Sequence, residues 1–80
     1  MPKKELSKKL TKSLEAVGFQ LRELRLNENL TRDEVSRYTK IAKHTLLRIE
    51  KKCQNYGIKH LLLLADFYNV PASEILSVID

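Results

Sequence analysis

The sequence has 80 residues and a net charge of +5, and 42% of its residues are apolar. This length predicts one domain with a single modest core, and the one cysteine excludes an internal disulfide framework and fits a reducing compartment. The sequence has no visible signal peptide and no apolar run near the length of a membrane span, so we expect a cytoplasmic protein with no membrane partner.

The basic residues are concentrated in the first part of the chain. Residues 61–80 contain no Lys or Arg, whereas residues 31–52 are rich in both. A one-sided basic field favours a polyanionic partner, with nucleic acid ahead of an anionic membrane surface. The alternative is a basic surface that serves solubility alone.

A stripe of apolar residues from Leu6 to Leu24, spaced three and four apart, predicts the first helix. This helix is expected to end near Asn27, where the following residues suit a left-handed cap. Its start has two alternatives. Either one long helix begins near Lys3, or residues 1–12 form a basic arm and the domain proper spans residues 13–80.

A T-x-x-E capping box from Thr31 to Glu34 predicts the start of a second helix. Val35 and Tyr38 are expected on its buried side. The helical pattern breaks near Lys40, which predicts a very short turn.

A third helix is predicted from Ala42 to about Lys51. Projection at 100° per residue places Leu46 and Ile49 toward the core. The opposite face is basic and surrounds a single leucine. The residues expected on this face are Lys43, His44, Leu47, Arg48 and Lys51.

A fourth helix is predicted from Ile58 to Tyr68 and a fifth from Pro71 to Ile79, which completes an all-α fold of five helices. The fourth helix has apolar residues on two sides. The second side is either buried within the domain or part of a dimer surface, a role for which the stripe at Leu6–Leu14 also competes. The candidate dimer surface consists of Leu63, Phe67, Val78 and Ile79.

No combination of residues suggests catalysis or metal binding. The spacing of Cys53 and His60 is not one that zinc sites use, and no nucleophile has a base and an orienting group beside it in the pattern. We therefore expect no enzyme activity, no metal and no cofactor.

A capped helix, a tight turn and a second helix with a basic outer face have the outline of a helix-turn-helix, whose second helix enters the DNA major groove. From Val17 to Leu76 the chain resembles the phage-repressor (Cro/cI-type, XRE) helix-turn-helix family. The matching text is "GFQLRELR" at 18–25, "LTRDEVSRYTKIAKHTLLRIEKK" at 30–52 and "LLLLADFYNVPASEIL" at 61–76. The resemblance implies a compact five-helix domain that binds double-stranded operator DNA as a dimer.

The resemblance also implies roles for individual residues. The base-reading positions are Lys43, His44, Leu47 and Arg48, and the positions at the DNA backbone are Arg32, Lys40, Lys51, Gln54 and Asn55. Arg25 and Glu50 match a structural ion pair. The family often has Gly where Lys40 stands and a Ser or Thr cap where Ala42 stands, so the turn is a departure from its pattern.

Two functional hypotheses follow. The first is a sequence-specific DNA-binding transcriptional regulator that acts as a homodimer on a two-fold operator. The second is a protein-interaction module, or an antitoxin-type protein, that binds a protein partner through Leu47, Leu63 and Phe67.

Overall fold

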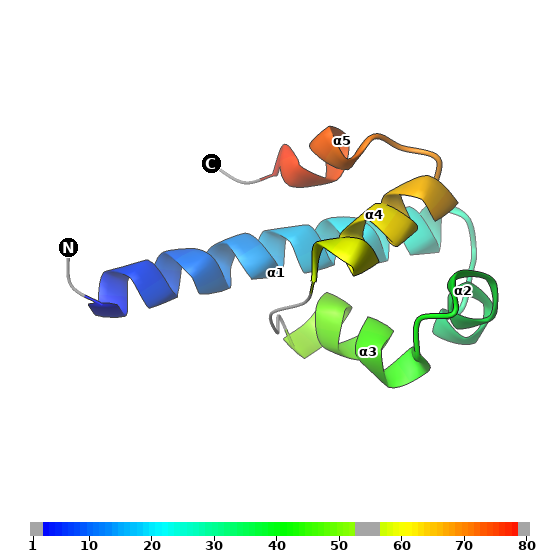
Figure 1. The fold of residues 1–80 in the computed structure, drawn as a ribbon, viewed down its shortest axis with the longest axis horizontal. Coiled ribbons are helices and arrows are strands. Elements are labelled where there is room, and N and C mark those ends of the chain that lie inside the picture. Colours follow the sequence, from blue (N-terminus) through cyan, green and yellow to red (C-terminus); the bar gives the residue numbers. More distant parts are fainter. Residues whose placement is uncertain (1–2, 53–56, 79–80) are drawn as a thin grey trace.

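The computed structural model describes residues 3–52 and 57–78, with side chains described from residue 8 to 51 and from 57 to 78. Within these residues helices are the only regular secondary structure and there is no strand, so the predicted all-α fold is confirmed (Figure 1). The elements are α1 (Lys3–Asn27), α2 (Arg32–Thr39), α3 (Lys43–Leu47), the π-helical turn η1 (Arg48–Lys52), α4 (Ile58–Phe67) and α5 (Ala72–Leu76).

The helix α1 is continuous from Lys3 to Asn27. Of the two alternatives for the N-terminus, the structure therefore has the long helix. A helix of 25 residues is about 37 Å long, close to the 41 Å of the longest molecular axis. Figure 1 shows its N-terminal part running past α3 and α4, and we call residues 3–14 the projecting half of α1.

The connection between α1 and α2 is short because hydrogen bonds cap the end of α1 and the start of α2. After α1 the backbone turns through Asn29, which has a left-handed φ of 56°, and the Leu30 N–H donates back to the Arg25 carbonyl at 3.1 Å. The predicted capping box then begins α2. The Glu34 N–H donates to the Thr31 hydroxyl at 3.1 Å and the Thr31 N–H donates to the Glu34 carboxylate at 3.0 Å. The Thr31 hydroxyl also donates to the Glu34 carboxylate, at 3.1 Å, and the two bonds that this carboxylate accepts, from the Thr31 N–H and the Thr31 hydroxyl, lower the pKa of Glu34.

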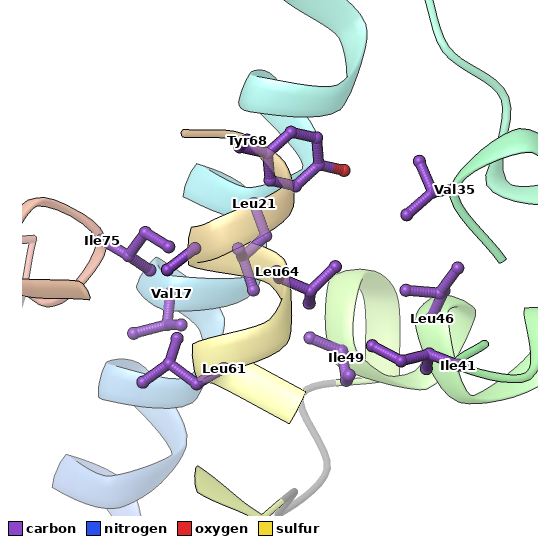
Figure 2. Packing of buried hydrophobic residues seen from close by; sticks show 11 residues of the cluster. Val17, Leu21, Val35, Ile41, Leu46, Ile49, Leu61, Leu64, Tyr68 and Ile75 are labelled. Carbon is purple, nitrogen blue, oxygen red and sulfur yellow. The ribbon is translucent and has the colours of Figure 1, made fainter. Parts of the chain in front are cut away.

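One aliphatic core joins all the helices, as Figure 2 shows. Apolar side chains from α1 and α4 meet those of α2 and α3, and Ile75 of α5 closes the core beside α1 and α4. Leu46 is 1% exposed, so the prediction that it is the core leucine of the third helix is correct. The buried residues are Val17, Leu21, Val35, Ile41, Leu46, Ile49, Leu61, Leu64, Ala65, Tyr68 and Ile75.

The prediction that Tyr38 is buried is wrong, because its side chain is 70% exposed. The helix α2 ends one residue later, so the core receives Val35 alone from this helix. The Tyr38 ring instead stacks on Phe67 of α4, with ring centroids 6.0 Å apart. Phe67 also meets Tyr68 edge-on at 5.1 Å.

Several element boundaries differ from the sequence-based expectation. The third α-helix gives way to a π-helical turn at Arg48, and α4 ends at Phe67 because the backbone turns left-handed at Asn69, with a φ of 57°. Pro71 caps α5 instead of starting it, and this helix ends at Leu76. The expected end at Ile79 lies outside the described residues.

Candidate nucleic-acid interface

The turn between α2 and α3 contains a left-handed lysine. Lys40 has φ 66° and ψ 13°, and its N–H donates to the Ser36 carbonyl at 2.9 Å. The Thr39 hydroxyl donates to the Val35 carbonyl at 2.8 Å and accepts the Ile41 N–H at 3.2 Å. These bonds hold the turn in place and bury Ile41, although a left-handed residue with a side chain costs roughly 1–2 kcal/mol.

Replacing Lys40 with glycine is therefore expected to stabilise the protein. Glycine adopts the left-handed conformation without the steric cost, but it loses more entropy on folding, so the net gain is about 1 kcal/mol. Thermal unfolding followed by circular dichroism should show a midpoint that is higher by roughly 4–8 °C. Lys40→Ala is the matched control, because it removes the charge and keeps the strain. An equal gain from alanine would assign the effect to charge and contradict the prediction.

The outer face of α3 carries the residues that the helical projection placed there. Lys43, His44 and Arg48 are exposed and Leu47 is half-buried, whereas Leu46 is buried in the core. Figure 1 shows α3 on the side of the molecule away from α5. The N-cap residue before α3 has no side-chain cap bond, as expected from an alanine.

Leu47 lies in a shallow pocket between the start of α2 and the face of α3. The pocket has a volume of ≈ 390 Å³ and is lined by Arg32, Lys43, His44 and Leu47. The Lys43 ammonium lies 3.2 Å from the Asp33 carboxylate, and both side chains are more than half exposed. A pair this exposed contributes little stability, so Lys43 can exchange Asp33 for another anion at small cost. The arrangement places the apolar Leu47 side chain next to the cationic donors of Arg32 and Lys43.

The π-helical turn η1 continues α3 with more residues per turn than an α-helix, and sequence reasoning missed it. In a regular α-helix two adjacent residues do not share one face, yet Ile49 and Glu50 are 1% and 8% exposed. Gly18 of α1 lies directly against this turn. A side-chain carbon at Gly18 would collide with the Ile49 carbonyl and lie 3.2 Å from the Glu50 carbonyl. The signal available in the sequence was a glycine in the middle of a strong helical stripe.

A buried ion cluster connects α1, α2 and η1. The Arg25 guanidinium donates to both carboxylate oxygens of Glu50, with Nε to Oε2 and Nη2 to Oε1 each at 3.0 Å. Its Nη1 donates to the Leu30 carbonyl at 2.8 Å. The structure thus brings together the two residues that the resemblance paired. Both are nearly enclosed, with side-chain exposures of 7% for Arg25 and 3% for Glu50.

Arg32 is a third member of this cluster, which the sequence did not reveal. Its Nε donates to Glu50 Oε1 at 3.1 Å, and its side chain is 22% exposed. Arg32 was expected at a DNA phosphate, and it also lines the pocket beside Leu47. One nitrogen is thus committed to Glu50, while the partly exposed guanidinium retains other donors. Glu50 also acts on Tyr68, because burial first and this carboxylate second raise the pKa of the phenol.

The remaining candidate residues are only partly brought together. Lys40 and Lys51 are exposed at the two ends of the α3–η1 segment, whereas Gln54 and Asn55 lie outside the described residues. Of the candidate dimer surface, Leu63 and Val78 are 37% and 36% exposed, and Ile79 again lies outside the description. Phe67 is half-buried beneath its aromatic contacts.

Residues 20–54 match the model of a family described as a helix-turn-helix domain. The match begins in the second half of α1 and continues through α2, the Lys40 turn, α3 and η1. The chain contains a helix-turn-helix. No curated protein and no solved structure matched the chain. Within the described part of the chain, no helix combines the length and the apolar character needed to cross a membrane.

Proposed function

We propose that this helix-turn-helix protein is a sequence-specific DNA-binding transcriptional regulator of the phage-repressor type, acting as a homodimer on a two-fold operator. The observation that carries the proposal is the exposed face of α3, where Lys43, His44 and Arg48 surround the half-buried Leu47. In a helix-turn-helix this second helix lies in the major groove.

Each residue on this face has chemistry suited to a base edge. Lysine and arginine donate to the O6 and N7 atoms of guanine, and an apolar side chain contacts the thymine methyl group. Leu47, which lines the pocket, can make such a methyl contact. The His44 ring can donate or accept, depending on its protonation.

The basic side chains around this face are the ones that we expect to bind DNA phosphates. Lys40 in the turn and Lys51 at the end of the segment are exposed, and the partly exposed guanidinium of Arg32 lines the pocket. Because Glu50 holds Arg32 by one nitrogen, the guanidinium is already oriented before DNA arrives. We expect this orientation to reduce the entropy lost when Arg32 binds a phosphate.

Binding to DNA of mixed sequence is the direct test. With several phosphate contacts, affinity should fall steeply between about 50 and 200 mM salt, since counterions are released on binding. Fluorescence anisotropy of a labelled duplex measures this dependence. Selection of bound sequences from a random library should then recover a two-fold site with half-sites about 34 Å apart. Absence of binding at low salt would reject the proposal and favour the alternative of a protein-partner module.

The variant Arg48→Ala should lose discrimination at one base pair. Arg48 is exposed on the face of α3 around Leu47, which we call the reading face. Its removal is expected to weaken binding to the preferred operator by about 1–3 kcal/mol, and to change binding to an operator with another base at that position only a little. The measurement compares the affinities of the selected operator and its single-base variants. Arg37→Ala, which removes an exposed arginine of α2, should leave the base preference unchanged. Equal behaviour of the two variants would remove Arg48 from the reading face.

A further inference from the structure

An exposed acid lies on the basic side of the helix-turn-helix. Residues 31–51, all of which the structure describes, contain three acids. Glu50 is buried in the ion cluster, and the Glu34 carboxylate is engaged in the capping box of α2. Asp33 differs from both, because its side chain is 64% exposed and its partner is Lys43 of the reading face.

The ion pair of Asp33 crosses the turn between α2 and α3. Arg37 follows Asp33 by four residues on α2, a spacing at which helical ion pairs form. The pair in the structure is nevertheless with Lys43, the first residue of α3, whose ammonium lies 3.2 Å from the carboxylate. In a helix-turn-helix the first residues of the second helix contact base edges. The ion pair therefore places a carboxylate beside a base-reading amine.

The contribution of this pair to stability does not account for its position. Both side chains are more than half exposed, and a pair of this kind adds little to the free energy of unfolding. Next to DNA an unpaired carboxylate is unfavourable, because the phosphates carry the same charge. In the major groove, however, cytosine and adenine present amino groups that donate to a carboxylate. An acid at this position therefore favours some base pairs over others.

We propose that Asp33 and Lys43 together read one G·C base pair. The Lys43 ammonium donates to guanine, and the Asp33 carboxylate accepts from the N4 amino group of the paired cytosine. Guanine presents N7 and O6 as acceptors, and the cytosine amino group lies beside O6. The ion pair has the complementary arrangement, with a donor and an acceptor 3.2 Å apart. The inference rests on the proposed function and names a base pair that its operator contains.

Both groups retain bonding capacity for the bases while they stay paired. Lysine has three N–H donors and a carboxylate has two acceptor oxygens, and the pair joins one nitrogen to one oxygen, Oδ1 of Asp33. An A·T pair fits this arrangement less well. Its amino group lies between the adenine N7 and thymine O4 acceptors, so a carboxylate at the amino group leaves the ammonium one acceptor instead of two.

The base preferences of two single variants test the proposal. Lys43→Ala identifies the base pair that the lysine reads, as the position where the preference is lost. Asp33→Ala should relax the preference at the same G·C pair by about tenfold. The double variant should lose little more than Lys43→Ala alone, because the two groups act as a unit. Asp33 is exposed, so its variant should keep the fold, which circular dichroism checks.

Glu74→Ala is the matched control for the loss of a negative charge. Glu74 is exposed on α5, which Figure 1 shows on the side of the molecule away from α3. This variant and Asp33→Ala lose the same charge, but Glu74→Ala should keep the base preference of the wild type. If Glu74→Ala relaxed the preference as much as Asp33→Ala, the effect would belong to net charge and the proposal would be wrong.

A modified operator tests the bond to the carboxylate. N4-methylcytosine still pairs with guanine, but a methyl group replaces the amino hydrogen that faces the major groove. The wild type should bind an operator with this base at the position of Lys43 about tenfold more weakly than the unmodified operator. Asp33→Ala should bind the two operators equally. Fluorescence anisotropy measures both affinities.

Three further results would overturn the inference while DNA binding itself remains. They are an A·T pair at the position that Lys43 reads, an Asp33→Ala variant with an unchanged base preference, and a wild type that binds the N4-methylcytosine operator as tightly as the unmodified one. A chain that binds no DNA at low salt loses the proposed function and this inference together.

Discussion

Replacing Glu50 with leucine is expected to lower the free energy of unfolding by about 3–5 kcal/mol. The substitution leaves Arg25 without a counter-charge at a site where its side chain is 7% exposed. Arg32 loses its partner in the same step. For a domain of 80 residues this is a large part of a total stability of roughly 4–12 kcal/mol. Urea denaturation followed by circular dichroism measures the loss.

The order of the single variants tests the geometry of the cluster. Arg25→Met should cost less than Glu50→Leu, because Arg32 still pairs with Glu50 after the change. The double variant Arg25→Met/Glu50→Leu should recover most of the loss, since it replaces the buried pair with apolar side chains. If Arg25→Met were the more damaging variant, the contact between Arg32 and Glu50 would contribute nothing to stability.

The cluster also links stability to the proposed function. The bond between Arg25 and Glu50 holds η1, the end of the α3–η1 reading segment, against α1. Arg32 connects the same carboxylate to the start of α2. Both helices of the helix-turn-helix therefore share one anchor. A change at Glu50 should alter DNA affinity through the relative position of the two helices as well as through the stability of the domain.

The fold was largely predictable because its signals are local. The capping box at Thr31 and the helical spacing of Leu46 and Ile49 depend on residues within one or two turns of each other. The prediction failed for Tyr38, where the pattern indicated a buried side chain and the helix ended too soon to bury it. Periodicity alone does not say where a helix leaves the core.

The site was less predictable because its geometry depends on contacts distant in sequence. Arg32 and Glu50 are separated by 18 residues, and nothing in the local pattern of either indicates their bond. The π-helical turn is another case, since projection at 100° per residue assumes a regular α-helix throughout. Lys51 lies within the π-helical turn, where the angle between successive residues differs from 100°, so its direction relative to Leu47 could not be derived from that projection.

Replacing Gly18 with alanine is expected to destabilise the protein by about 2 kcal/mol, although the same change in an isolated helix would stabilise it by about 1 kcal/mol. The reversal follows from packing, because the added carbon would collide with the Ile49 carbonyl and press on the Glu50 carbonyl, and neither backbone atom can rotate away. Displacement of η1 should also weaken DNA binding. Gly57→Ala is the matched control at the other glycine of the chain, where the nearest atom is the Lys59 nitrogen at 4.0 Å. Thermal unfolding of both variants measures the difference. If Gly18→Ala were as stable as Gly57→Ala, α1 would have room to move away from η1, and the close contact between them would not position the reading segment.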